Sequence, residues 1–354
     1  MTLESKPGHW RERDMRYWLG HAFIVTYGSW PDPEMSCFRG IFPPVARFNF
    51  ASSAVIRSHI GRVIAMNTSP RLSLNNGVLI DQLGYGLYKV PREDTPRLVA
   101  TALEAGYRHF DTAAMYGNES GVARGIVSLC GVEAAPGGSG ESAPPTSRED
   151  LFITTKVWND DQGYDATLRA FDTSMINLGL EYVDMYLIHW PCPKRGLFQE
   201  TYRALETLYR EGKVRAIGVS NFQPQHLDRL LETAEVVPAV NQIELHPWLQ
   251  QGELREKHRE LGILTEAWSP LGRGQVLEDP DILALAAEHE VTAAQIILRW
   301  HLQLGNIAIP KASSWDRIRE NLDIYRFELS ALDMADIAGL DRGHRTGSHP
   351  DNVN

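Results

Sequence analysis

Cysteines and long apolar runs are scarce in this chain of 354 residues. Its three cysteines, Cys37, Cys130 and Cys192, lie at unrelated spacings and fit neither a disulfide framework nor a metal motif, so we expect a reducing compartment, the cytoplasm. No apolar run approaches the roughly 18 residues of a membrane helix. The longest run near the start, residues 22–26, is also shorter than the apolar stretch of about 7–15 residues in a signal peptide.

Two further signals are missing. No G-x-G-x-x-G fingerprint follows a predicted strand, which argues against a Rossmann-type nucleotide site. The histidines have neither H-x-H nor H-E-x-x-H spacing, so no metal site is predicted, although a metal-dependent barrel hydrolase using His109, His189 and His246 is a rival interpretation. The formal net charge of −10 predicts no broad attraction to nucleic acid or membranes, and it leaves room for a local basic pocket.

The composition, 43% hydrophobic and 23% charged, is typical of a globular chain with one large domain or two small ones. Two segments depart from it. Residues 1–65 combine aromatic residues, arginines and prolines without sustained periodicity, so we interpret them as an irregular extension outside the core, or alternatively as an arm that binds a partner. Residues 131–148 are rich in Gly, Pro, Ser and Ala and indicate a flexible surface loop. The functional domain is expected to span residues 66–354.

From residue 72 the pattern becomes regular. The run LSLNNGVLI predicts a β-hairpin around Asn76-Gly77, a dipeptide that supplies the positive φ angles of a tight turn. Strands are predicted at 83–86, 107–110, 151–156, 182–188, 214–219, 239–244, 264–268 and 307–310, and helices at 95–105, 119–129, 166–178, 199–211, 224–235, 251–261, 281–289, 292–304 and 314–322. This alternation of strands and helices over about 250–290 residues predicts an α/β fold, the (β/α)8 TIM barrel.

The stretch GYRHFDTAAMYGNE, residues 106–119, is apolar up to Phe110 and then becomes polar. We predict a buried strand that ends at the Asp111 carboxylate and continues into a turn carrying the phenol of Tyr116. A buried aspartate at a strand end is more often a structural hydrogen-bonding residue than a catalyst. The residues that surround Asp111 in space therefore decide its interpretation.

Two later strands also end in ionisable residues, Lys156 and His189. Lysine is rarely buried without a partner, so Lys156 predicts an ion pair with Asp111. The ends of parallel strands gather on one face of a barrel, where active sites are built. An ammonium nearby would lower the phenol pKa of Tyr116 towards neutrality, which predicts general acid catalysis on a carbonyl that His189 orients. The alternative is four isolated structural residues.

Seven motifs resemble those of the aldo-keto reductases, in the order of that family: GYRHFDTAAMYGNE, FITTKVWN, DMYLIHWP, AIGVSNF, AVNQIELHP, AWSPLGRG and IPKASSWDRIRENL. The resemblance covers Met66 to Asn354, and within the family the chain is most similar to the bacterial 2,5-diketo-D-gluconate reductases, including its ending SHPDNVN. It implies a barrel with an N-terminal β-hairpin and a C-terminal loop over the active-site face. It also implies a monomer that reduces aldehydes and ketones with NADPH, with Tyr116 as proton donor.

Cofactor contacts are implied by the same resemblance. Binding of the nicotinamide amide and stacking on its ring are assigned to Ser220, Asn221, Gln242 and Trp268. The pyrophosphate would lie along Ser269, Leu271, Gly272 and Arg273. Adenine would contact Glu320 and Asn321.

Basic residues after the last predicted strand indicate a phosphate site. Lys311 and Arg317, together with Ser313, are suited to bind an extra phosphate at the N-terminus of the following helix, which favours NADPH over NADH. Relatives use these positions for the adenosine 2′-phosphate. Ala312 departs from the family, which commonly has serine there, and predicts weaker phosphate binding. Without the resemblance, a solvated charged surface would be the better interpretation of Lys311 and Arg317.

The substrate is less constrained. The resemblance assigns the pocket mouth to Tyr88, Trp158, His189 and Trp190, although large aromatic residues at strand ends also serve packing. A keto-acid substrate would be attracted by Lys194, Arg195 and Arg273, unless these side chains only face water. An alternative for the whole chain is a nucleotide-binding barrel that acts as a redox-sensing or regulatory subunit with little turnover.

Overall fold

The computed structural model describes residues 69–130 and 147–354. The predicted extension at 1–65 and nearly all of the predicted loop at 131–148 lie outside the described residues. Within the described ranges, no helix is long and apolar enough to cross a membrane.

Parallel strands form one eight-stranded sheet in which each strand pairs with the next along the chain. They are β3 (Tyr85–Gly86), β4 (His109–Asp111), β5 (Phe152–Val157), β6 (Val183–Ile188), β7 (Val214–Ser220), β8 (Val240–Glu244), β9 (Leu264–Trp268) and β10 (Ile307–Ala308). The backbone N–H of Gly84 donates to the carbonyl of Ala308, and the N–H of Ala308 donates to the carbonyl of Gln82, both at 2.9 Å. The first and last strands therefore also pair, and the predicted (β/α)8 barrel is confirmed.

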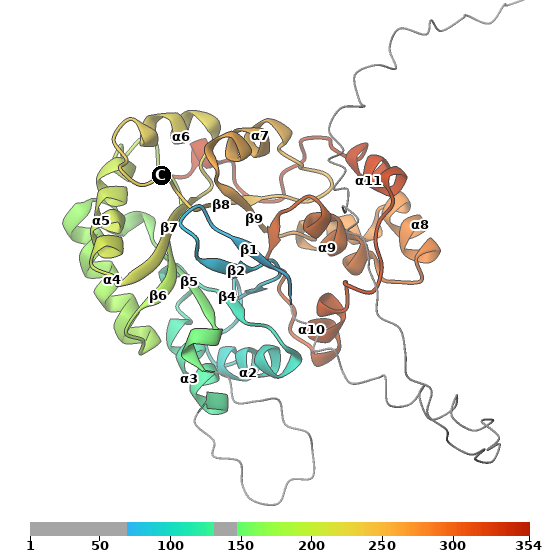
Figure 1. The fold of residues 1–354 in the computed structure, drawn as a ribbon, viewed down its shortest axis with the longest axis horizontal. Coiled ribbons are helices and arrows are strands. Elements are labelled where there is room, and N and C mark those ends of the chain that lie inside the picture. The colour runs from blue at the N-terminus through green and yellow to red at the C-terminus, as the bar shows by residue number, and fades with distance from the viewer. Residues whose placement is uncertain (1–68, 131–146) are drawn as a thin grey trace, which may run out of the picture. The chain divides into compact units, whose positions relative to one another are not determined.

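Helices surround the strands on the outside (Figure 1). They are α2 (Thr95–Ala105), α3 (Glu119–Cys130), α4 (Tyr164–Leu178), α5 (Phe198–Arg210), α6 (Pro224–Leu231), α7 (Gly252–Leu261), α8 (Pro280–Glu288), α9 (Ala293–Gln303), α10 (Trp315–Leu322) and α11 (Ala331–Ala338). Local signals start and end them. Thr292 and Gln295 form a reciprocal capping box at the start of α9, and Gly305, with φ of 75°, follows its end.

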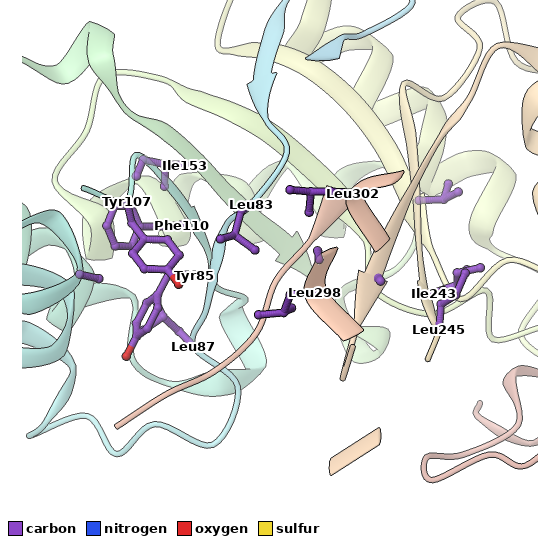
Figure 2. Close-up of a cluster of buried hydrophobic side chains, with 14 of the residues drawn as sticks. Leu83, Tyr85, Leu87, Tyr107, Phe110, Ile153, Ile243, Leu245, Leu298 and Leu302 are labelled. Carbon is purple, nitrogen blue, oxygen red and sulfur yellow. The ribbon is translucent and has the colours of Figure 1, made fainter. Parts of the chain in front are cut away.

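Apolar side chains fill the space between the strands and the helices (Figure 2). On one side of this core the rings of Tyr85 and Tyr107 meet edge to face, with centroids 5.5 Å apart, and Phe110 packs beside them. Leu298 of α9 lies near Leu83, which precedes β3. Full burial of such side chains contributes about 1.5–3 kcal/mol each, so this core fixes the strands whose ends carry the candidate site.

A β-hairpin, β1 (Arg71–Ser73) and β2 (Leu79–Asp81), lies across the ring of strands (Figure 1). Leu74 and Ile80 pack against side chains from the first residues of the barrel strands, among them Phe152, Met185, Val240 and Ile307. The hairpin therefore closes the end of the barrel where the strands begin. Its turn differs from the expectation: the loop is residues 75–77, closed by the Leu74 N–H on the Val78 carbonyl at 2.9 Å, and only Gly77 has positive φ, 84°.

Two helices differ from the sequence prediction. Helix α6 ends before residue 235, because the carboxylate of Glu206 accepts the backbone N–H groups of Glu235 and Val236 at 2.7 and 2.9 Å and holds the chain in its path towards β8. Helix α11 was not expected. It begins with a capping box between Ser330 and Asp333, a signal that the sequence does contain, and it packs against α8.

Candidate active site

Four ionisable side chains meet where β4, β5 and β6 end. Asp111 closes β4, Lys156 lies near the end of β5, and His189 follows β6. Tyr116 ends a short 3-10 helix, residues 114–116, that follows β4. The Nζ atom of Lys156 is 3.5 Å from the Oη atom of Tyr116, and the rings of Tyr116 and His189 have centroids 5.5 Å apart. The barrel therefore brings together all four predicted catalytic residues.

The ammonium of Lys156 is completely buried and fully bonded. It donates to both carboxylate oxygens of Asp111 at 2.7 Å and to the carbonyl of Thr112 at 2.9 Å. A buried ion pair offsets its desolvation only when the geometry is good and further hydrogen bonds complete it, and this pair meets both conditions. The predicted pairing of Lys156 with Asp111 is confirmed.

The acidity of Tyr116 differs from the expectation. Burial raises the pKa of this phenol well above its ordinary value of 10, and the negative charge of Asp111 raises it further. The expected lowering by Lys156 is wrong for this site, because the two oxygens of Asp111 offset the ammonium charge at close range. Tyr116 therefore carries its proton at neutral pH, the form that a proton donor requires.

His189 is neutral for a related reason. Burial lowers the pKa of its imidazole well below 6.5, and the positive charge of Lys156 lowers it further. Aromatic rings border it: the Trp158 indole lies edge to face at 5.1 Å between centroids, and the Trp190 indole is stacked at 6.5 Å. A neutral imidazole in such a setting can hydrogen-bond a carbonyl without adding charge to the site.

A cavity of about 770 Å³ extends from Asp111, Tyr116 and His189 to the start of α10. The predicted cofactor residues that line it are Ser220, Asn221, Gln242, Trp268, Ser269, Leu271, Arg273, Lys311, Arg317, Glu320 and Asn321. Gly272 and Ser313 are not among its lining residues. Of the predicted substrate residues, Tyr88, His189 and Trp190 line the cavity. Trp158 is not among the lining residues but packs against His189.

At the inner end, the predicted nicotinamide-binding residues already hold one another. The side-chain amide of Asn221 donates to the His189 carbonyl at 2.9 Å and to Ser220 Oγ at 3.0 Å, and its oxygen accepts from the Trp268 indole at 2.8 Å. Asn221 is thus a brace for the residues around it. The Gln242 oxygen Oε1 has no hydrogen-bond partner among the described residues, so it is an acceptor available to a ligand amide.

At the outer end, the cavity is basic and open. Arg273, Lys311 and Arg317 are exposed cavity-lining residues, and none forms an ion pair with the described part of the chain. Helix α10 starts after Ser314, whose side chain does not cap it. Uncapped N–H groups beside exposed cations fit a phosphate group, so this end suits an anionic ligand.

Sequence reasoning missed several residues of the site. Lys89, Met115 and Ser348 line the cavity, and Glu266 lies buried beneath it with its carboxyl on the Gln242 amide at 2.8 Å. Glu266 is the only charged residue in the run LTEAW, and this was its only signal. Lys89 gave no signal in the sequence, because its left-handed backbone conformation, with φ of 58°, is seen only in the structure.

The C-terminal loop reaches the site through Glu244 at the end of β8. The Glu244 carboxylate accepts the backbone N–H of Thr346 at 2.6 Å and that of Gly347 at 3.1 Å. Gly347 lies against Trp268 so closely that an added Cβ would come within 2.4 Å of the indole. The predicted C-terminal loop over the active-site face is therefore present.

A metal-dependent hydrolase gains no support from the described residues. Among them, no group of three or more His, Cys, Asp or Glu side chains is placed to hold a metal ion. His109 faces Glu266 at 3.5 Å, and His246 contacts Glu244 at 3.3 Å.

The barrel, the half-buried phenol, the buried lysine and carboxylate, and the long cavity define an oxidoreductase that acts on carbonyl groups. The chain belongs to the aldo/keto reductase family, whose family model matches residues 82–342.

The chain aligns with two curated relatives over almost their entire length. An aldo-keto reductase of Mycolicibacterium smegmatis is 52% identical over 81% of this chain and 98% of the relative. A glyoxal reductase of Bacillus subtilis is 47% identical over 80% of this chain and 96% of the relative.

Solved structures of aldo-keto reductases are also similar to this chain. A crystal structure of an aldo/keto reductase from Brucella melitensis is 50% identical, with a TM-score of 0.71 over 77% of this chain and 100% of that chain. The crystal structure of a Bombyx mori aldo-keto reductase in complex with NADP is 33% identical, with a TM-score of 0.72 over 79% of this chain and 95% of that chain.

Proposed function

We propose that this protein reduces aldehydes and ketones to alcohols with NADPH. The observation that carries the proposal is the placement of Tyr116 Oη 3.5 Å from Lys156 Nζ at the closed end of a cavity that is basic at its other end. A protonated phenol serves the proton half of a carbonyl reduction. An elongated cavity with a phosphate-compatible end suits a dinucleotide for the other half, and membership of the family supports both assignments.

NADPH, when bound, supplies the hydride. Tyr116 donates its proton to the carbonyl oxygen of the substrate, and the Asp111–Lys156 pair holds an ammonium next to the phenolate oxygen that this transfer leaves. Neutral His189 donates a hydrogen bond to the same carbonyl oxygen and so fixes the orientation of the substrate.

The remaining cofactor assignments follow the cavity. The Trp268 indole, held by Asn221, gives the nicotinamide ring a flat surface, and Gln242 with Ser220 meets its amide. The pyrophosphate is assigned to Ser269, Leu271, Gly272 and Arg273, the 2′-phosphate to Lys311, Ser313 and Arg317, and adenine to Glu320 and Asn321. Because three cations at the outer end form no ion pair within residues 69–130 and 147–354, we propose a preference for NADPH over NADH.

We propose sugar keto-acids or 2-oxoaldehydes as substrates, in keeping with the resemblance to 2,5-diketo-D-gluconate reductases and with the glyoxal reductase relative. Tyr88 and Trp190 line the entrance, and Trp158 supports His189. Attraction of a keto-acid by Lys194 and Arg195 loses support, because neither lines the cavity. The Arg195 guanidinium is bonded to the Asp160 carboxylate at 2.7 Å and to a backbone carbonyl at 2.6 Å.

We further propose a cytoplasmic monomer whose barrel domain spans residues 66–354. The thiol of Cys192 is free and buried, as suits a reducing compartment.

The test is loss of NADPH absorbance with 2,5-diketo-D-gluconate, methylglyoxal and an aromatic aldehyde in parallel, with NADH as the cofactor control. Tyr116→Phe keeps the ring and removes the proton, so kcat is expected to fall about 10²–10⁴-fold while NADPH affinity stays unchanged. Undiminished turnover by this variant contradicts the mechanism. Tight NADPH binding without turnover of any carbonyl by the unaltered protein transfers support to the redox-sensing or regulatory subunit.

A further inference from the structure

A second carboxyl group lies inside the barrel beneath the candidate site. Glu266 of β9 is completely buried, and its Oε2 is 2.8 Å from the Gln242 nitrogen Nε2. The same nitrogen lies 2.8 Å from Asp111 Oδ2. One side-chain amide is thus shared by two carboxyl groups, and both of its N–H bonds are used.

The other oxygen of Glu266 faces a histidine. Oε1 is 3.5 Å from His109 Nε2, and neither atom has another hydrogen-bond partner among the described residues. His109 is completely buried, and burial lowers the pKa of its imidazole to about 3, so the ring is neutral. Its Nδ1 lies 3.3 Å from the Asp81 carbonyl, which can only accept, so Nδ1 carries the hydrogen and Nε2 presents a lone pair.

An ionised Glu266 therefore places two acceptors opposite each other in a completely buried site. A proton on Oε1 turns this contact into a donor–acceptor pair and satisfies both orphan atoms. It leaves Oε2 as a carbonyl oxygen that accepts the Gln242 N–H.

The charge balance points the same way. The titratable groups that face Glu266 are His109 and Asp111 of β4, Lys156 of β5, and Tyr116 after β4. Lys156 is the cation among them, and both oxygens of Asp111 already pair with it. A second carboxylate would leave this buried group of residues with a net negative charge, which is unfavourable in a low dielectric.

We propose that Glu266 is a neutral carboxylic acid that positions Gln242 for the reduction proposed above. It donates to His109 and accepts from Gln242, so both N–H bonds of Gln242 point at carboxyl groups and its free oxygen points into the cavity, towards the nicotinamide amide. Glu266 touches neither substrate nor cofactor and acts through Gln242. The inference rests on the proposed function for its catalytic consequence and on the barrel geometry alone for the state of the carboxyl.

This state makes the site sensitive to alkaline pH. Burial raises the pKa of Glu266 to about 8, with a further contribution from the Asp111 charge. Above that pH an ionised Glu266 withdraws the donor from His109 and adds negative charge near Tyr116, which weakens the phenol as an acid. The proposed activity is then lost on the alkaline side.

Two matched variants test the proposal. Glu266→Gln keeps an acceptor for Gln242 and supplies a permanent N–H donor for His109, so kcat and the KM for NADPH near neutral pH are expected to stay within about twofold of the unaltered protein, and activity persists at about pH 9. Glu266→Leu keeps the volume and removes both hydrogen bonds. Its KM for NADPH is expected to rise by about fivefold, since Gln242 loses one hydrogen bond and such a bond is worth roughly that factor.

A loss of activity in Glu266→Gln as large as in Glu266→Leu would overturn the proposal, because it would mean that the charge of Glu266 is needed. The same loss of activity at alkaline pH in Glu266→Gln and in the unaltered protein would overturn the proposal as well.

Thermal unfolding tests the protonation state without any turnover. The folded-state pKa of Glu266 lies above its ordinary value, so stability falls as pH rises from about 4.5 through about 8. Glu266→Gln removes this loss, and its Tm is expected to exceed that of the unaltered protein by more at about pH 9 than at about pH 5. An unchanged Tm difference across this range refutes a neutral Glu266. Inactivity of the unaltered protein and of both variants towards every carbonyl compound, with the Tm difference as expected, instead refutes the proposed function alone.

Discussion

The two ends of the cavity follow opposite electrostatic rules. At the inner end the charges of Lys156 and Asp111 are buried and paired, the Gln242 amide donates to Asp111, and the Asn221 amide donates to the His189 carbonyl. At the outer end Arg273, Lys311 and Arg317 are exposed and pair with nothing in the described residues. A proton donor has to be held in one geometry before the substrate arrives, whereas a binding site for an anion gains when its cations are left for the ligand.

Different consequences for stability follow. The inner group has already been taken out of water, so it depends on complete pairing and loses much when one partner is removed. The outer cations remain hydrated, so removing one of them leaves the fold unchanged and affects only a ligand that carries the matching charge.

The largest expected effect is that of Lys156→Met on the inner end. Methionine has a similar length but leaves the buried Asp111 carboxylate without its cation, so the free energy of unfolding is expected to fall by about 3–5 kcal/mol. Urea denaturation monitors the change. Lys194→Met, at an exposed position outside the cavity lining, is the matched control and is expected to change stability by less than about 0.5 kcal/mol. Similar values for both variants would end the distinction between the two ends.

Arg317→Ala tests the outer end and is expected to act on affinity. Loss of one charge-assisted contact to a phosphate costs about 1.5–3 kcal/mol, so the KM for NADPH is expected to rise about 10–100-fold. The KM for NADH and the thermal stability are expected to stay unchanged. Arg319→Ala is the control, because Arg319 lies on the same helix, stacks on Trp315 and does not line the cavity. An equal rise for NADH would show that Arg317 does not read the extra phosphate.

The smallest effect is expected for Ala312→Ser, which restores the hydroxyl common in the family. The Ala312 side chain is 5% exposed and lies where the core meets the cavity lining. One added hydrogen bond of about 1 kcal/mol lowers the KM for NADPH about fivefold if the hydroxyl faces the ligand. A loss of thermal stability without a change in KM would instead place the hydroxyl in the core and make position 312 part of the packing.

The positions of the catalytic residues could be predicted from the sequence, but the shift of the Tyr116 pKa could not. The strand-end positions of Asp111, Lys156 and His189 predicted that they meet, because the ends of parallel strands share one face, and the barrel brings them together. The direction of the Tyr116 pKa shift was not accessible, since it depends on how completely Asp111 offsets Lys156 at 2.7 Å and on the depth of burial.

Residues whose role comes from the third dimension were also missed. Glu266 lies in a strand with no other charged residue, and only the fold places its carboxyl opposite Gln242. Arg195 had the right charge for an anionic substrate, but its guanidinium is engaged by Asp160 and by the backbone. Charge can be read from a sequence, whereas its neighbours cannot.

The hairpin has a consequence for traffic through the molecule. Because Leu74 and Ile80 close the base of the barrel, ligands reach the cavity from the opposite face, where the strands end. A ligand that reaches Tyr116 therefore enters and leaves through this face, and a ligand bound above it blocks its exit. A nucleotide lying along the floor of the cavity, beneath the carbonyl compound, would therefore bind before that compound and leave after the alcohol.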